Sequence, residues 1–357
     1  MSTRYRVAII GAGIGAQHLE ACLAHPELFE VAVVCDLDRE RAAGLAAKAG
    51  CGVSTSLDEV LVRPDIDVVD ICLPPGLHRA AILAALAAGK HVMCEKPLVA
   101  SLAEVDEVEQ AALAAGRILL PVYQYRFGNG LGKLRRLIDA GLAGTPCVAT
   151  IETHWNRTAA YYAVAWRGRR ASELGGAVLS HAIHAHDLLT AVLGPVRQVN
   201  ARLATRVNPI ETEDCAAILF EMASGALATS SVTLGAATDM SRLRFCFSGL
   251  TAQSGLAPYA PASDPWTFTA RRPEEQAAID RLLAAWTPHE EGFARLFALF
   301  HGALEGTMPP PVTVADARAS LQLVTAIYHA AATGATVELP LTGDHPAYRG
   351  WLPTGTF

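Results

Sequence analysis

Short apolar runs alternate with longer stretches of helical spacing in the first third of the chain. The runs are mostly apolar throughout instead of alternating, which is typical of strands covered on both faces, as in a parallel sheet. The runs are Tyr5–Ile10, Val31–Cys35, Val68–Leu73, His91–Cys94 and Ile118–Val122, and helices are expected at Gly15–Ala24, Arg39–Ala49, Leu77–Ala88 and Leu102–Ala115. This alternation predicts an α/β domain over residues 1–123, with a doubly wound parallel sheet and right-handed crossovers.

Beyond residue 123 the pattern changes to longer stretches in which apolar and polar residues alternate. Such strands indicate an antiparallel sheet with one solvated face. Strands are expected at Cys147–His154, Val196–Arg206, Cys215–Glu221, Ala226–Thr233 and Arg242–Ser248, and helices at Gly132–Ala140, Ser180–Leu193, Glu274–Trp286, Phe293–Glu305 and Ala315–Ala332. Residues 124–357 are therefore predicted to form an α+β domain on a largely antiparallel, open sheet. We expect the open face to pair copies of the chain into a homodimer or homotetramer.

Composition narrows the class of protein. The 357 residues carry a net charge of −6, and 51% of them are hydrophobic, so a sizeable core and no nucleic-acid partner are expected. No apolar run is as long as a membrane span requires. The eight cysteines are scattered without the spacing of metal ligands, which favours buried thiols in the reducing cytoplasm.

A glycine-rich turn follows the first predicted strand. Its sequence is Gly11-Ala12-Gly13-Ile14-Gly15-Ala16, and it opens the first predicted helix. Glycines in this context let the backbone approach a diphosphate at the start of a helix. Asp36 ends the second apolar run, where a carboxylate accepts hydrogen bonds from a ribose and favours NAD over NADP. Arg39 or Arg41 would weaken that preference, and a turn without ligand is the alternative.

Two loops lie at the ends of later strands, where ligands bind in such sheets. Leu73-Pro74-Pro75 is a stiff loop that would form a wall against a flat ring, and His78 follows it as a residue that starts a helix. Lys96 belongs to Glu95-Lys96-Pro97. Close to an oxidised nicotinamide its pKa would be lowered, which makes it a general base or a donor to the reacting oxygen. An ordinary surface lysine is the alternative.

The densest group of polar residues is Gly175–Asp187. Ser180 is a candidate cap for a helix in which Ser180, His184 and Asp187 share one face, with His181 beside them and His186 pointing away as a structural residue. A metal site formed by His181 and His184 with His154 or Glu152 is the alternative. We expect no metal, because no carboxylate or thiol completes the set within the helix.

Taken together, these motifs resemble the glucose–fructose oxidoreductase, inositol dehydrogenase and rhizopine-catabolism family (Gfo/Idh/MocA) over residues 4–335. The most specific match is Ala88-Gly89-Lys90-His91-Val92-Met93-Cys94-Glu95-Lys96-Pro97, and Gln124-Tyr125-Arg126-Phe127 also matches. The resemblance implies an NAD(P)-dependent sugar or cyclitol dehydrogenase with Lys96 and His184 as catalytic residues. The motifs and the resemblance together predict cofactor contacts from Gly11, Gly13, Ile14, Gly15, Asp36, Leu73, Pro74, His78, Glu95, Lys96 and Gln124. The predicted substrate contacts are Lys96, Tyr125, Arg126, Trp166, Arg167, Ser180, His181 and His184.

Ser180 departs from the family pattern. Many members carry Asp four residues before the catalytic histidine, and members that act on nucleotide-linked or glycosidic sugars often carry Asn-Gln there, which Ser180-His181 resembles more. The main hypothesis is reversible hydride transfer between NAD and a secondary alcohol of a sugar or polyol, with NADP less favoured. One alternative is redox-assisted glycoside cleavage that regenerates NAD, and another is an NAD-binding sensor without catalysis.

Overall fold

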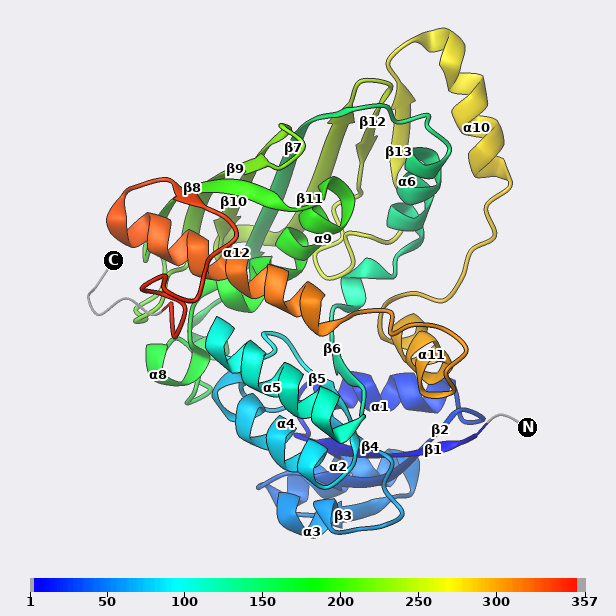
Figure 1. Ribbon diagram of the computed structural model, residues 1–357, viewed down its shortest axis with the longest axis vertical. Helices are drawn as coiled ribbons and strands as arrows, with labels where there is room; N and C mark the ends of the chain where they lie inside the picture. Colours follow the sequence, from blue (N-terminus) through cyan, green and yellow to red (C-terminus); the bar gives the residue numbers. More distant parts are fainter. Residues whose placement is uncertain (1–2, 352–357) are drawn as a thin grey trace. The chain divides into compact units, whose positions relative to one another are not determined.

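The computed structural model describes residues 3–351, and the chain divides into two units within it (Figure 1). The first unit contains the chain as far as Gln124 together with Phe293–Arg318, and the second contains Tyr125–Gly292 and the chain from Ala319 on. Residues 352–357, the end of the expected second domain, lie outside the described residues. The α/β class is confirmed.

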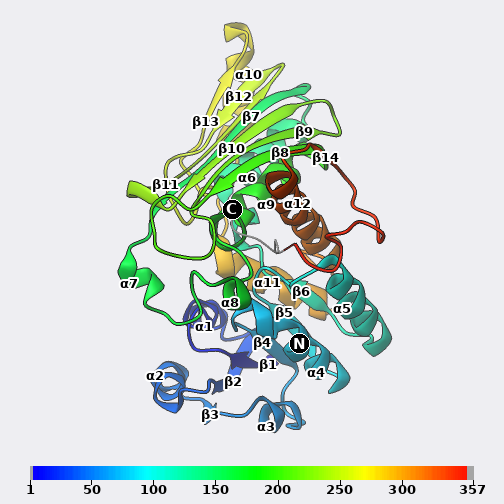
Figure 2. The same cartoon turned by 90° about the vertical axis from the view of Figure 1, so that its left-hand side faces the viewer.

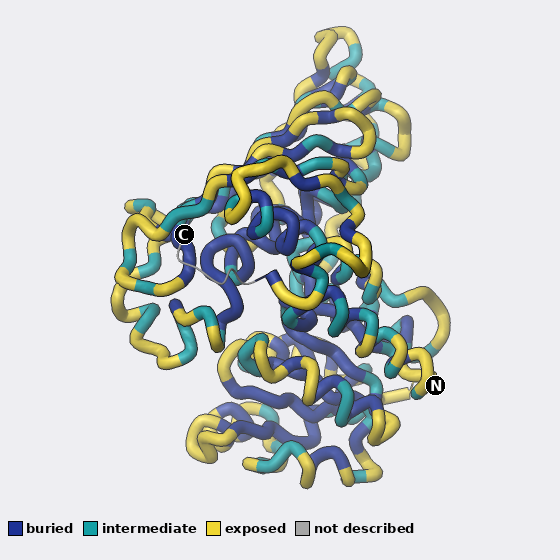
Figure 3. The backbone as a smooth tube through the Cα atoms, turned by 60° about the vertical axis from the view of Figure 1, so that its left-hand side comes forward, coloured by how far each residue is buried: buried dark blue, intermediate teal, exposed yellow. Residues whose placement is uncertain are grey.

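A six-stranded parallel sheet forms the centre of the first unit. Its strand order is β3-β2-β1-β4-β5-β6. All neighbours are parallel, and successive strands are added on one side of β1 as far as β3 and on the other side from β4 on. Most strand positions are buried (Figure 3), which agrees with their apolar runs. The strands are β1 Tyr5–Ile10, β2 Phe29–Cys35, β3 Gly52–Ser54, β4 Val68–Ile71, β5 His91–Cys94 and β6 Leu119–Pro121. Ligands of such sheets bind beside the strand ends at this change of sides between β1 and β4, which is where the predicted motifs lie.

The helices of the first unit include three with the predicted bounds. Side chains of Asp38 and Ser101 cap the starts of α2 and α5, and left-handed Gly50 and Gly116 follow their ends. The helices are α1 Gly15–Ala24, α2 Arg39–Ala49, α3 Leu57–Leu61, α4 His78–Ala87 and α5 Leu102–Ala115, with 3₁₀ turns at Pro75–Leu77 and Gln124–Arg126. Strand β3 and helix α3 were not predicted, because three and five residues are too few to show a period.

Helix α11, Gly292–Leu304, returns the chain to the first unit. The Phe297 ring lies 5.8 Å from that of Phe29, and the His301 ring 5.6 Å from that of Tyr5. These contacts differ from the sequence-based grouping, which assigned this helix to residues 124–357. A boundary drawn where the pattern changes does not reveal a later segment that returns to the first core.

The second unit is built on an eight-stranded sheet with the order β13-β12-β11-β7-β10-β9-β8-β14 (Figure 2). Only β7 and β10 pair in parallel among these strands, so the predicted, largely antiparallel sheet is confirmed. Buried and exposed residues alternate along β9 and β10. The strands are β7 Pro146–Asn156, β8 Val196–Ala204, β9 Cys215–Met222, β10 Leu227–Thr233, β11 Gly235–Phe247, β12 Leu250–Gln253, β13 Thr267–Ala270 and β14 Val337–Glu338.

Helix α9, Ile183–Leu193, packs on β7 and carries His184 and His186 of the sequence cluster, whereas His181 lies in the π-helical turn before it. The remaining helical elements are α6 Asn129–Asp139, α7 Ala159–Tyr162, α8 Arg170–Glu173, a π-helical turn at Val178–Ala182, α9 Ile183–Leu193, a 3₁₀ turn at Pro273–Glu275 and α10 Gln276–Ala284; α12, Val314–Thr333, begins in the first unit. Within residues 3–351, none of the helices has the length and apolar character needed to cross a membrane.

Candidate active site

The glycine turn leaves open space at the start of α1. A Cβ on Gly11, whose φ is +104°, would lie 2.4 Å from the Cys72 carbonyl oxygen, so this position requires glycine. A Cβ on Gly13 would meet no heavy atom within 4 Å. No side chain of the described residues caps α1, and its N-cap residue Ile14 is partly exposed; Gly15 is its first residue. An uncapped helix start beside an unfilled glycine turn fits the diphosphate of a dinucleotide.

Asp36 is fixed at the end of β2 by three donors. Its carboxylate accepts the backbone N–H groups of Ala12 at 2.8 Å and Asp38 at 2.9 Å, and the Arg41 guanidinium at 2.6 Å. Burial raises the pKa of the Asp36 carboxyl, but these hydrogen bonds outweigh it and hold the pKa below its usual value. The carboxylate is therefore ionised and lies against the glycine turn.

We expect Asp36→Ala to reduce the preference for NADH over NADPH at least about tenfold. The substitution would remove the expected ribose acceptor and free Arg41, whose side chain is 55% exposed, to bind a 2′-phosphate. Fluorescence titration with both reduced cofactors measures the change. The double variant Asp36→Ala/Arg41→Ala should lose NADH affinity without gaining NADPH affinity. Equal NADPH affinity in the two variants would contradict the role given to Arg41.

The two proline-containing loops are linked through His78. This residue is fully buried, and its ring nitrogens lie 2.8 Å from the carbonyl oxygens of Leu73 and Pro97. Burial lowers the pKa of His78, and the hydrogen bonds to the two carbonyl oxygens offset that only in part. The predicted cofactor contact at His78 is thus a buried side chain that contacts the backbone of Leu73 and Pro97. Gln124 follows β6 at the end of the first unit's long segment.

Glu95 points inward beneath Lys96. One oxygen of its carboxylate accepts the Lys96 backbone N–H at 3.0 Å, and the other lies 3.1 Å from Nε2 of His18. The opposite ring nitrogen of His18 lies 2.8 Å from the Asp70 carboxylate. Sequence reasoning missed His18 and Asp70. The available signal was a carboxylate inside the apolar run Val68–Leu73, since a buried charge requires a partner.

The π-helical turn that precedes α9 begins at Val178 and has no side-chain cap within residues 3–351, so the predicted Ser180 cap is wrong. Two buried glutamates, Glu213 and Glu173, form hydrogen bonds to the residues of this turn. Glu213 accepts the backbone N–H of Val178 at 3.0 Å, and a Cβ on Gly176 would lie 1.9 Å from the Glu213 carbonyl oxygen. Ser180 instead donates its hydroxyl to Glu173 at 2.9 Å. A buried carboxylate therefore lies one hydrogen bond from the position where the family pattern has Asp, and neither glutamate was predicted.

His184 lies in an aromatic and ionic setting within the second unit. The ring of Tyr125 stacks on it with 4.3 Å between centroids and 22° between planes. Arg126 donates two hydrogen bonds, of 2.8 and 2.6 Å, to Asp187, which is buried one turn after His184. The predicted substrate residue Arg126 therefore holds the segment that carries Tyr125 against α9.

His181 belongs to a second aromatic group. The Tyr161 hydroxyl lies 3.2 Å from His181 Nε2, and the Trp155 ring meets the His181 ring edge-on at 5.2 Å. The Arg167 guanidinium covers the Tyr161 ring at 3.7 Å and lies 5.0 Å from the Trp166 ring. The structure thus brings His181 and Arg167 to the same tyrosine, with Trp166 beside Arg167.

The metal alternative of the sequence analysis conflicts with the alternation along β7. The Trp155 ring contacts that of His181. Successive side chains of a strand point to opposite faces, so His154 and Glu152 lie on the other face of the sheet. There Glu152 pairs with Arg242 and His154 contacts Ser231. His186 is fully buried against Ser230, in agreement with a structural role.

Known proteins match the chain along most of its length. Residues 5–123 match the oxidoreductase family with an NAD-binding Rossmann fold, and residues 131–252 match the GFO/IDH/MocA C-terminal domain. The 1,5-anhydro-D-fructose reductase of Ensifer adhaerens is 30% identical over 325 residues, which cover 87% of this chain and 91% of that one. The inositol 2-dehydrogenase of Mycolicibacterium smegmatis is 36% identical over 146 residues, 40% of this chain and 42% of that one.

Solved structures agree with the fold. The WlbA dehydrogenase of Bordetella pertussis, in complex with NADH and UDP-GlcNAcA, gives a TM-score of 0.85 at 27% identity and covers 96% of this chain and 100% of that one. A levoglucosan dehydrogenase in complex with NADH shares the fold, with a TM-score of 0.79 at 22% identity. The match covers 95% of this chain and 100% of that one.

Proposed function

Because the chain belongs to the Gfo/Idh/MocA family of NAD-dependent oxidoreductases, we propose that it oxidises or reduces a secondary alcohol carbon of a sugar, sugar derivative or cyclitol. The observation that carries this proposal is the group of residues at the carboxyl ends of the parallel strands in the first unit. There the open glycine turn, the ionised Asp36 and the Glu95-supported Lys96 follow strands of one parallel sheet. This arrangement supports a dinucleotide with a cationic side chain at its reactive end.

Lys96 and His184 are the catalytic residues of this proposal. NAD, when bound, supplies the hydride acceptor or donor. Nζ of Lys96 donates a hydrogen bond to the substrate oxygen and stabilises the negative charge that develops on it. The imidazole of His184 takes the hydroxyl proton in oxidation and returns it in reduction, while Tyr125 fixes the plane of the ring. Ser180 and Glu173 hold the π-helical turn that precedes His184.

The surroundings of Arg167 favour a substrate that carries an anionic group. Its Nε and Nη1 atoms are buried and have no hydrogen-bond partner among residues 3–351. Buried N–H groups without an acceptor are costly, and the fork of donors of a guanidinium matches a carboxylate or phosphate. The stacking of Arg167 on Tyr161, which contacts His181, supports a place for this group in the same pocket. We therefore extend the proposal to acidic or nucleotide-linked sugars.

The test is NAD-linked absorbance across matched pairs of neutral and acidic sugars, with cyclitols and nucleotide-linked sugars such as UDP-GlcNAcA included. We expect acidic or nucleotide-linked members to turn over at higher kcat/KM than their neutral partners. Arg167→Met should remove this advantage, a loss of about tenfold or more. Arg169→Met is the matched control, because Arg169 is exposed. Equal losses in both variants would contradict the specific role of Arg167.

The same assay separates the alternative functions. Formation of one NADH per substrate oxidised supports the dehydrogenase. Cleavage of glycosides with only catalytic amounts of NAD would instead indicate redox-assisted glycoside cleavage. Tight NADH binding without turnover on any member of the panel would favour a sensor.

Oligomer and compartment complete the proposal. Val148, Leu219 and Leu227 are about half exposed on β7, β9 and β10, which supports a homodimer or homotetramer formed through this sheet face. Light scattering should give a mass of at least two chains, and Leu219→Glu should reduce it; a monomeric wild type would refute this assembly. All eight cysteines are free thiols, which supports a cytoplasmic location.

A further inference from the structure

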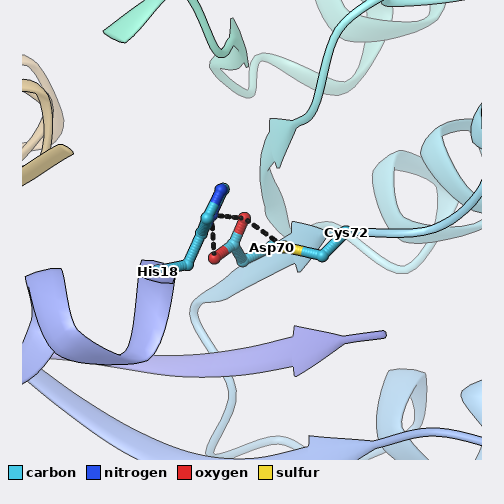
Figure 4. Close-up of side chains that lie close together, drawn as sticks. All are labelled: His18, Asp70 and Cys72. Atoms are coloured by element: carbon cyan, nitrogen blue, oxygen red, sulfur yellow. Dashed lines mark hydrogen bonds and ion pairs between the residues drawn. The ribbon is translucent and has the colours of Figure 1, made fainter. Parts of the chain in front are cut away.

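A cluster of ionisable groups is buried in the first unit, directly beneath the Lys96 loop. His18 lies on α1, Asp70 on β4, and Glu95 follows β5. His18 and Asp70 have no exposed surface, and Glu95 is 5% exposed. Figure 4 shows the His18 ring beside the Asp70 carboxylate, with Cys72 next to it. The proposed catalytic roles of Lys96 and His184 do not account for these buried charges.

His18 is placed between two carboxylates. Its Nδ1 lies 2.8 and 3.0 Å from the two Asp70 oxygens, and its Nε2 lies 3.1 Å from a Glu95 oxygen. Carboxylate oxygens next to both ring nitrogens favour the imidazolium form of His18, in which each nitrogen donates a hydrogen bond. Burial lowers the pKa of His18, but the charge of Asp70 and the hydrogen bonds that the ring makes together outweigh burial and hold the pKa well above its usual value.

The thiols and aromatic rings around His18 are uncharged. Burial raises the pKa of the Cys72 thiol to about 12 and that of Cys22 well above its usual value, so both are neutral. From α11 the rings of Phe293 and Phe297 lie 4.7 and 5.7 Å from the ring of His18. The imidazolium is therefore sealed from water on the side of α11 and balanced by Asp70 and Glu95.

We propose that His18 is a positioning residue for hydride transfer, which acts on Lys96 through Glu95. The chain of contacts runs from Asp70 to His18, from His18 to one oxygen of Glu95, and from the other oxygen to the Lys96 backbone N–H at 3.0 Å. A carboxylate held by two charge-assisted hydrogen bonds fixes the direction in which the backbone leaves β5. This inference rests on the proposed function, because it concerns the placement of Lys96.

The first measurement needs no substrate. The chain has only four lysines, so ¹⁵N-lysine labelling gives four backbone amide signals, and Lys96→Arg identifies that of Lys96. In His18→Gln and Asp70→Asn, hydrogen exchange of the Lys96 amide should accelerate at least about tenfold. The control is His301→Gln, because His301 is also a buried histidine of the first unit with aromatic neighbours but contacts Thr3. Unchanged Lys96 exchange in both cluster variants, or equal acceleration in the control, would overturn the proposal.

The second measurement separates positioning from general stability. On the best substrate of the panel, His18→Gln should lower kcat about tenfold or more, while KM and the NADH dissociation constant stay within about threefold. A loss confined to NADH affinity would overturn the proposal. If the wild type binds no NADH and oxidises no substrate, the proposed function fails, while the exchange measurement still decides whether His18 fixes the Lys96 backbone.

Metal content is the third measurement. Nδ1 of His18, an Asp70 oxygen and Sγ of Cys72 lie within 4.8 Å of one another, close enough to share an ion. Protonation of both His18 nitrogens excludes coordination, so the purified protein should contain no stoichiometric metal and Cys72→Ser should leave Lys96 amide exchange unchanged. One bound metal ion per chain that is lost in Cys72→Ser would overturn the proposal.

Discussion

Lys96→Met is expected to lower turnover by about three orders of magnitude while leaving the NADH dissociation constant within a few-fold. Removal of one preorganised donor to a developing oxyanion costs about 10²–10³ in kcat, and loss of a proton-transfer partner costs about 10²–10⁴. Methionine keeps the length and apolar stem of lysine, and the Glu95 contact to the backbone N–H remains. Steady-state kinetics on the best panel substrate, together with NADH titration, measure the two quantities.

Lys48→Met is the matched control for this experiment. Lys48 lies at the end of α2, where its side chain is 54% exposed and pairs with Glu20. We expect it to keep wild-type turnover, because exposed ion pairs contribute little. If Lys96→Met retained wild-type kcat while binding NADH, Lys96 would not be a catalytic residue, and the proposed roles of both Lys96 and His18 would fall.

His184→Phe is expected to lower kcat by about 10²–10⁴ with little change in stability. Phenylalanine keeps a ring that stacks on Tyr125, but it has no nitrogen to take or return a proton. Kinetics and thermal unfolding together separate the loss of proton transfer from a loss of packing. Tyr125→Phe, which keeps both rings, should change kcat less than His184→Phe does. Because Tyr125→Phe leaves the nitrogens of His184 in place, an equal loss of kcat in the two variants would contradict a distinct role of His184 in proton transfer.

The fold was largely predictable because local signals agree with it. Asp38 and Ser101 cap α2 and α5, left-handed Gly50 and Gly116 follow their ends, and the observed bounds equal the predicted ones. Strands β12 and β13 were missed. Each has four residues, and their register is set by pairing with neighbouring strands, which no local pattern encodes.

The candidate site was predictable only where one motif contains it. The glycine turn and the Glu95–Lys96 segment are each one short stretch of sequence, so the place of each at the end of a strand could be predicted. His18 and Asp70 are 52 residues apart, and their contact depends on the packing of α1 against the sheet. The partner of Ser180 was hidden for another reason: the π-helical turn and the loop before it bring Glu173 to Ser180, whereas regular helical spacing predicts no such pair.

The path of the chain through its two units has a consequence for folding during translation and for the choice of fragments that can fold alone. Helix α11 supplies Phe297 and His301 to the core around Phe29 and Tyr5, yet it is translated after nearly the whole second unit. The first core is thus incomplete until about residue 318 has left the ribosome. A fragment truncated at Gln124 leaves these apolar surfaces without their cover, whereas one that appends Phe293–Arg318 through a linker restores it.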